Sequence, residues 1–373
     1  MSEHHAAATQ HKPSPAVRGS IPQWRLVWRK FRKSRLAVAG AVVIVICYLM
    51  AAFAEFCAPY DPRFRDVDHP AAPPMRVRLF ADGRLQRPFV YGVVQTVNME
   101  TLTRSYEIDP DRRHPLALFV RSDGYRLWDL WEGNVHLFGT ADGGRAYLLG
   151  TDRDGRDLLS RIILGSRLSL SIGLVGVALS FCFGIVLGSI SGYFGGAVDM
   201  VIQRFIEVLT SIPTLPLWMG LSAALPLRWP VVKVFFFISL ILSLLGWPEL
   251  ARVVRGKYLS LREEDFITSA VLDGVGTRGV IFRHMLPSFM SHIIAAATLA
   301  VPSMILAETA LSFLGIGLRP PAISWGVLLQ DAQSVDSVVA MPWLFTPGLF
   351  VVVSVLAFNF FGDGLRDAAD PYK

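Results

Sequence analysis

The sequence predicts an all-α integral membrane protein with six transmembrane helices and a β-rich insert between the first two. Of its 373 residues, 52% are hydrophobic and only 18% are charged, whereas an ordinary soluble domain has roughly 25% charged residues. Six long stretches carry no charged residue, and a membrane-spanning helix needs about 20 mostly apolar residues. The stretches are 36–54, 168–198, 208–227, 234–248, 285–307 and 337–362.

The uncharged stretches also exclude two simpler interpretations. One such stretch could be a buried helix of a soluble protein, but six in one chain could not. The fourth is short by itself, and apolar residues extend it across Lys233 and Glu249, while the fifth continues past Glu308 to residue 318. The first is longer than the roughly 7–15 apolar residues of a cleaved signal peptide and no A-x-A site follows it, which predicts a retained anchor.

The basic residues predict the orientation. Six Lys and Arg lie within residues 25–35, directly before the first span, and positive charge marks the cytoplasmic side. An even number of spans then places both termini in the cytoplasm. The predicted units are a cytoplasmic segment 1–35, a first span 36–57, an extracytoplasmic insert 58–166 and a core 167–373 with five spans and a cytoplasmic loop 252–288.

The insert reads as a β structure. It is nearly neutral, with 16 Arg against 15 acidic residues over 58–167, and loops longer than about 60 residues translocate regardless of charge. Asp-Gly pairs at 82–83, 123–124 and 142–143 are flanked by alternating apolar residues, a strong hairpin signal. Ordinary surface turns in an irregular loop are the alternative. No residues have a metal-ligand or catalytic spacing, and the three Cys contain no CxxC pair.

The loop 252–288 carries the features with the clearest mechanism. Residues 260–263 match S-x-x-E, a capping box, which predicts a helix starting near Leu261. Gly274 should end it, and a second short helix should run over 277–286 and end at Pro287. An apolar stripe results, which a partner subunit would cover; the alternatives are the chain's own spans or the membrane surface. The stripe consists of Ile267, Ala270, Val271 and Gly274.

The same loop resembles the EAA loop of ABC-importer permeases. That motif is G-x9-I-x-L-P, and here Gly274 is followed after nine residues by His284, Met285, Leu286 and Pro287. The triplet position upstream holds residues 268–270, Thr-Ser-Ala, so its Glu is absent and nearby acids are the candidates to replace it. The resemblance assigns contact with an ATPase to Glu264, Asp265, Ser269, Ala270, Asp273, Gly274, His284, Leu286 and Pro287.

Further segments extend the resemblance over most of 150–373. Residues 149–157 look like the G-T-D-x-x-G-R-D signature before the second span in the second permease of dipeptide and oligopeptide importers. Residues 308–326 and 362–371 resemble the segment after the fifth span and the C-terminal ending of that family. The long insert looks like that of oligopeptide-type members. An ABC type I importer permease-like fold in a bacterial inner membrane is implied.

The resemblance also implies partners. These are a second permease subunit forming a heterodimer, two cytoplasmic ABC ATPase subunits, an extracytoplasmic solute-binding protein and the lipid bilayer, with no nucleic acid. Peptides are the default cargo, although opines, glycosides and metal chelates use similar permeases. The role of the insert stays open between a docking platform, a gate and a cover.

Enzymatic chemistry is not expected of the chain itself. No G-x4-G-K-[ST] motif occurs, so ATP would be hydrolysed by partner subunits. The G-x-G-x-x-G at 274–279 follows a helix and lacks a surrounding βαβ unit, which argues against a dinucleotide site. We therefore expect no catalytic residue, cofactor or metal. The alternative functions are a stand-alone secondary transporter or channel, and a membrane enzyme with the insert as its catalytic domain.

Several residues within the spans are candidates for helix packing or for the translocation path. Glycines at 184, 188, 192 and 196 should form one flat face for close helix approach. Glu308 must face protein or water, because a charge at the bilayer centre costs about 2.5–3.5 kcal/mol. It is either a pathway residue or a buried packing partner. Pro213 and Pro302 can break or kink helices around a path.

Overall fold

The computed structural model describes residues 23–81, 84–97 and 104–369. Five of its helices are long and apolar enough to cross a membrane, and a sixth crossing results if one bent helix pair is counted as a span. The helices are α1 (Gln23–Phe31), α2 (Arg35–Ala52), α3 (Ala54–Cys57), α4 (Leu158–Phe194), α5 (Gly196–Ser211), α6 (Thr214–Ala223), α7 (Val231–Leu261), α8 (Asp265–Leu272), α9 (Thr277–Gly279), α10 (Leu286–Ser288), α11 (Met290–Phe313), α12 (Trp325–Gln330), α13 (Val335–Ala340) and α14 (Thr346–Ala369). A π-helical stretch η1 (Val280–Met285) joins α9 to α10, and a 3₁₀ turn η2 (Pro342–Phe345) precedes α14.

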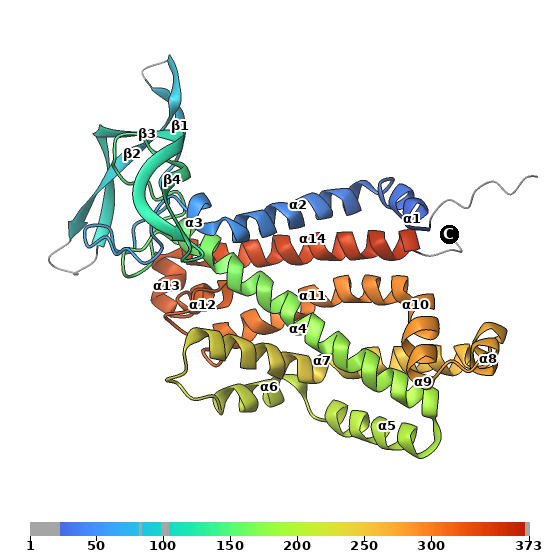
Figure 1. Cartoon of the computed structure of the whole chain (residues 1–373). Coiled ribbons are helices and arrows are strands. Elements are labelled where there is room, and N and C mark those ends of the chain that lie inside the picture. Colours follow the sequence, from blue (N-terminus) through green and yellow to red (C-terminus); the bar gives the residue numbers. More distant parts are fainter. Residues whose placement is uncertain (1–22, 82–83, 98–103, 370–373) are drawn as a thin grey trace, which may run out of the picture.

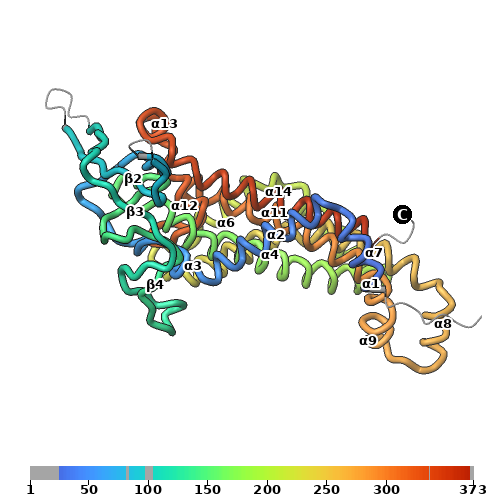
Figure 2. The backbone as a smooth tube through the Cα atoms, turned by 90° about the horizontal axis from the view of Figure 1, so that it is seen from above, coloured from blue at the N-terminus to red at the C-terminus, as the bar shows by residue number. Residues whose placement is uncertain are grey.

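The long helices pack side by side into an elongated bundle (Figures 1 and 2). The β-sheet, α12 and α13 lie at one end of the bundle. The start of α1, the last residues of α14 and the α8–α10 region lie at the other end, as both views show. A core of buried apolar residues from α4, α7, α11, α12 and α14 runs through the bundle, with Ile162, Leu242, Ile305 and Trp325 among its fully buried members.

The third predicted span is a broken helix pair. The stretch 208–227 was expected to be one span, whereas α5 and α6 meet at an angle of 86°. Pro213 is the N-cap of α6, and Ile212 before it has extended dihedral angles. A proline disfavours helical geometry in the residue before it and lacks an N–H for the helix ladder. Pro213 therefore breaks this span, as its residue type predicted.

Two other boundaries differ from the prediction. α4 begins at Leu158, before the expected core boundary at 167, because the Asp157 side chain accepts a hydrogen bond from the Ser160 N–H and caps the helix there. The stretch 337–362 does not form one helix from its start. Ser334 caps the separate helix α13, and α14 follows only after η2, which begins at Pro342.

The insert contains a four-stranded antiparallel sheet in the order β1-β2-β3-β4, which confirms its β character. The strands are β1 (Arg78–Ala81), β2 (Arg84–Val97), β3 (Arg104–Leu127) and β4 (Trp131–Thr140). Each strand pairs with the next along the chain. The first Asp-Gly pair, 82–83, lies outside the described residues, between the paired strands β1 and β2.

The other two Asp-Gly pairs do not form hairpin turns. Residues 123–124 lie inside β3, where the register to β4 shifts between Arg121 and Tyr125. The β3–β4 turn instead falls at residues 128–130, with positive φ at Trp128 and Asp129. Residues 142–143 form a turn after β4, and the residues that follow are not a strand. An Asp-Gly pair tolerates a bulge as well as a turn, so it did not specify the register.

The insert is anchored on the sheet-side ends of α2–α4. The indole Nε1–H of Trp128 donates to the Ala52 carbonyl oxygen at 2.9 Å. The guanidinium of Arg167 lies 3.9 Å from the centre of the Trp128 ring and forms two hydrogen bonds with Glu55, at 2.6 and 2.7 Å. The His136 ring also contacts the Ala58 carbonyl oxygen at 2.5 Å. These contacts place the β3–β4 hairpin directly on the helix bundle.

Three of the four predicted glycines form the close contact between α4 and α7. A Cβ added at Gly188 would lie 2.6 Å from the Ala251 carbonyl oxygen, and one at Gly192 would lie 2.6 Å from the Tyr258 Cβ. A Cβ added at Gly184 would likewise lie 2.9 Å from the Leu250 Cδ2. Gly196 does not join this face, because it lies at the start of α5 and a Cβ there would meet nothing within 4 Å.

We expect Gly188→Ala to destabilise the protein by about 1–3 kcal/mol, the usual cost of overpacking a tight contact. Gly256→Ala is the matched control, because Gly256 lies in α7 and its added Cβ would meet nothing within 4 Å. Alanine there should stabilise by about 0.5–1 kcal/mol through helix propensity. Thermal unfolding in detergent micelles measures both. A Gly188→Ala midpoint at or above that of the unmodified chain would contradict the close approach of α4 and α7.

Candidate functional site

A helical unit projects from the end of the bundle opposite the sheet. This projecting unit, residues 262–288, comprises α8, the turn at Gly274 and the helical stretch from α9 through α10 (Figures 1 and 2). The predicted start of its first helix was wrong. Ser260 still belongs to α7, and α8 begins at Asp265 after Glu264, which forms no side-chain cap hydrogen bond. The predicted second helix is confirmed, and it continues through Pro287 to Ser288.

Gly274 ends α8 in a Schellman motif. Its φ is +78°, the left-handed region that favours glycine. The Gly274 N–H donates to the Val271 carbonyl oxygen at 3.0 Å, and the Val275 N–H donates to the Ala270 carbonyl oxygen at 3.1 Å. These two bonds are the pair that defines the motif. The helix–glycine–helix geometry expected from the sequence is therefore present.

The unit is fixed to the bundle by its own small core. Ile267, Val280 and Met285 are buried against Val254 and Tyr258 of α7 and Ile293 of α11. The Tyr258 hydroxyl also donates to the Ile281 carbonyl oxygen at 3.0 Å. Ile267 and Ala270 were expected to face a partner, but the chain's own residues bury both. The alternative that the stripe packs on the chain's own spans therefore holds for these two residues.

The outer face of the unit remains apolar and uncovered. Phe266, Val271 and Phe282 are about half exposed, and Leu272 is 82% exposed. Glu264, Asp265 and Asp273, which are neighbours of these apolar residues in the sequence, are also exposed. A firmly anchored element that exposes several large apolar side chains has the composition of a protein-binding surface.

The other predicted loop residues differ in how far they are exposed. Ser269, Gly274 and Pro287 are exposed, whereas His284 and Leu286 are half-buried. Leu286 packs against the unit's small core. Phe266, Leu272 and Phe282 were not among the predicted contact residues, although a large apolar residue beside acidic ones in a loop is a usable signal for an exposed contact.

Glu308 lies in a buried polar cluster, the Glu308 hub, formed with Ser169, Ser312 and Ser324. Its carboxylate is 0% exposed. One oxygen accepts hydrogen bonds from the Ser312 and Ser324 hydroxyls, both at 2.8 Å, and the other accepts from Ser169 at 3.4 Å. Each serine hydroxyl oxygen also accepts a hydrogen bond from a backbone N–H. Leu318 donates to Ser312, Val327 donates to Ser324, and Trp325 donates to Ser169. The hub thus ties α4, α11 and the start of α12 together.

The geometry of the hub favours the packing interpretation of Glu308. Ser312 lies one turn away on the same helix and Ser324 follows 16 residues after Glu308, whereas Ser169 is 139 residues away, so the sequence could not reveal that contact. The two proline candidates differ in position. Pro302 is buried inside α11, which continues through it, whereas Pro213 stands at the break between α5 and α6.

The loop over residues 149–157 is tightly structured at the sheet end of the bundle. Asp152 is buried and forms an ion pair with the buried Arg161, and one of its oxygens accepts the Asp154 and Arg156 N–H groups, both at 2.9 Å. Burial raises the pKa of Asp157 to about 6, although the Ser160 hydroxyl and N–H donate hydrogen bonds that favour its ionised form. These acids therefore hold the loop and the start of α4.

A bundle of long apolar helices with a projecting helix–glycine–helix unit defines a multi-pass membrane protein. Residues 184–372 match the family described as "Binding-protein-dependent transport system inner membrane component". Residues 22–74 match the family described as "N-terminal TM domain of oligopeptide transport permease C". The chain belongs to the family of binding-protein-dependent transport system inner membrane components, and it is a multi-pass inner membrane protein with the fold of ABC importer permeases.

Curated relatives agree with this assignment. The chain is 41% identical over 184 residues to the oligopeptide transport system permease protein OppC of Escherichia coli (strain K12), an alignment covering 48% of this chain and 56% of that protein. It therefore spans little more than half the length of that relative. The OppC protein of Bacillus subtilis (strain 168) is 28% identical over 369 residues, which cover 98% of this chain and 95% of that protein.

Among solved structures, the inward-facing MetNI methionine ABC transporter is similar to part of the bundle. The match has a TM-score of 0.43 at 16% identity and covers 56% of this chain and 95% of that chain.

Proposed function

We propose that the chain is a transmembrane permease subunit of an ATP-driven, binding-protein-dependent importer of oligopeptides, dipeptides or related small solutes. The observation that carries the proposal is the projecting unit, because it is anchored by its own core and exposes Phe266, Val271 and Leu272 at the end of the bundle. A separate ATPase subunit seated on this face would transmit its motion through Val280 and Met285 to α7 and α11.

The proposal includes an orientation and a set of partners. The end with the projecting unit faces the cytoplasm together with both termini, and the sheet faces the outer compartment. The permease pairs with a second permease subunit, two cytoplasmic ATPases and an extracytoplasmic solute-binding protein. The chain itself hydrolyses no ATP. Closure of the ATPases would shift the spans between outward-open and inward-open packings, a change in population between two states.

Uptake by reconstituted vesicles tests this proposal. Vesicles containing the chain, its second permease and the ATPases should take up peptide only with internal ATP and external binding protein. Vesicles with the chain alone and an ion gradient should take up none. Uptake by the chain alone would favour a stand-alone secondary transporter or channel. A cysteine introduced in the projecting unit should not react with a membrane-impermeant reagent added outside intact cells. Labelling of that cysteine would contradict the proposed orientation.

A further inference from the structure

A small pocket at the sheet end of the bundle has no role in the function proposed above. This loop pocket lies between the α6–α7 connection and the segment that follows α11, and its volume is about 80 Å³. On the same measure of volume, one water needs about 10–15 Å³, so this pocket can hold several non-hydrogen atoms of a side chain. Its apolar wall includes Leu225, Trp229, Val231, Ile316 and Leu318.

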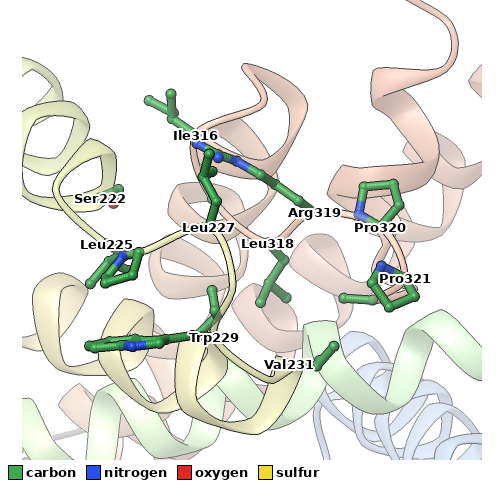
Figure 3. Close-up of a pocket in the computed structure, with 14 residues that line it drawn as sticks. Ser222, Leu225, Leu227, Trp229, Val231, Ile316, Leu318, Arg319, Pro320 and Pro321 are labelled. Carbon is green, nitrogen blue, oxygen red and sulfur yellow. The ribbon is translucent and has the colours of Figure 1, made fainter.

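Two polar side chains of the loop pocket have unused hydrogen-bonding capacity. The Ser222 hydroxyl is buried, with the residue 2% exposed, and it has no hydrogen-bond partner within the described chain. Such hydroxyls are normally satisfied. The Arg319 Nε donates to the Gly315 carbonyl oxygen at 2.8 Å, which orients the guanidinium. Its Nη groups have no hydrogen bond or ion pair within the described ranges. Figure 3 shows the Arg319 side chain extending toward Ile316 and Leu227, with Leu318 and Trp229 beneath it.

The wall that carries Arg319 is held rigidly. The Leu318 N–H donates to the Ser312 hydroxyl oxygen at 3.0 Å, and Ser312 belongs to the Glu308 hub. The segment therefore keeps its place relative to α4 and α11. Binding sites gain affinity when their groups are already positioned before the ligand arrives.

An apolar pocket beside one oriented guanidinium matches a ligand that joins an apolar side chain to a carboxylate. Arginine binds carboxylates with two parallel hydrogen bonds. Peptide cargo of any sequence carries a carboxylate next to its last side chain. One cation with an otherwise apolar pocket would read this shared group and tolerate different residues.

We propose that the loop pocket receives the C-terminal residue of a peptide cargo, with its carboxylate on Arg319 and its side chain against Leu318 and Trp229. The Ser222 hydroxyl donates to an oxygen of the same residue. This inference rests on the proposed import function and on the orientation that places the sheet end outside. It assigns the permease its own contact with cargo, in addition to any selection by the binding protein.

The test compares free-acid and amidated forms of one peptide ending in leucine. Uptake is measured in the complete reconstituted importer at saturating, fully loaded binding protein, so that the preference of the binding protein does not enter. Arg319→Gln should lower uptake of the free acid about five- to tenfold and leave the amide unchanged, and Arg319→Lys should keep part of the difference. Arg228→Gln is the matched control, because Arg228 is exposed in the same connection and does not line the pocket.

A second variant tests the apolar part of the pocket. Val231→Phe should lower uptake of a peptide ending in leucine several-fold more than one ending in alanine. The ratio of the two uptake rates is measured within one variant, so it does not depend on how much protein folds.

Three outcomes would overturn the inference. Arg319→Gln could leave the uptake of both peptides unchanged, or it could lower the uptake of both equally. It could also reduce ATP hydrolysis stimulated by the unloaded binding protein, in which case the pocket receives that protein and not the cargo. Failure of the unmodified importer to take up either peptide would instead count against the proposed function.

Discussion

Leu272→Glu should abolish ATP-coupled uptake while the permease still folds. Leu272 is 82% exposed at the end of α8, so the substitution should change the free energy of unfolding by less than about 0.5 kcal/mol. If an ATPase covers this face, a buried carboxylate would replace an apolar contact. Residues at the centre of an interface contribute about 2 kcal/mol or more, and each 1.4 kcal/mol is about tenfold in affinity. We expect at least a tenfold loss of co-purifying ATPase.

Val67→Glu is the matched control for this prediction. Val67 is 86% exposed and lies in the segment before the sheet, far from the projecting unit. The same substitution there should leave ATPase binding and unfolding temperature unchanged. Leu272→Ala should give an intermediate loss, because it removes the contact without adding a charge. Equal ATPase binding by Leu272→Glu and the unmodified permease would remove the projecting unit from the proposed coupling.

The spans were predictable because their signal is local and their environment is uniform. A stretch without charge is sufficient evidence for a helix in lipid, and five stretches became long helices. The bend between α5 and α6 was not predictable, because hydropathy does not determine the angle between two helices. Pro213 identified the residue at which the helix could break, whereas the angle depends on how α6 packs against α7.

The insert shows where local turn signals are overruled. Asp123 and Gly124 favour a turn, yet the hairpin turns later, at residues 128–130. The Trp128 indole donates to the Ala52 carbonyl oxygen and stacks with Arg167, so the helix bundle selects the position of the turn. A contact between segments that far apart leaves no pattern in either one. For the same reason the sequence did not reveal the contact between Ser169 and Glu308, or that Ser222 and Arg319 line one pocket.

Glu308→Leu should be among the most destabilising single substitutions in the bundle. Leucine has a similar volume but accepts no hydrogen bond, so the Ser169, Ser312 and Ser324 hydroxyls would lose their shared acceptor. A buried polar group without a partner costs about 1–3 kcal/mol, and three such groups give an expected loss of about 3 kcal/mol or more. Thermal unfolding in detergent micelles measures this loss. Ser239→Ala is a control of equal burial, because the Ser239 hydroxyl only donates to the Phe235 carbonyl oxygen of its own helix.

Glu308→Gln separates a packing role from a pathway role. The glutamine oxygen can still accept from Ser312 and Ser324, while its amide N–H₂ can donate to Ser169, whose oxygen has a second lone pair. The fold should therefore lose only about 1 kcal/mol. If Glu308 serves packing, uptake per folded molecule should stay within about twofold of the unmodified permease. A variant that folds normally but transports nothing would show that the negative charge itself acts on the cargo or on the moving spans, and the hub would then belong to the translocation path.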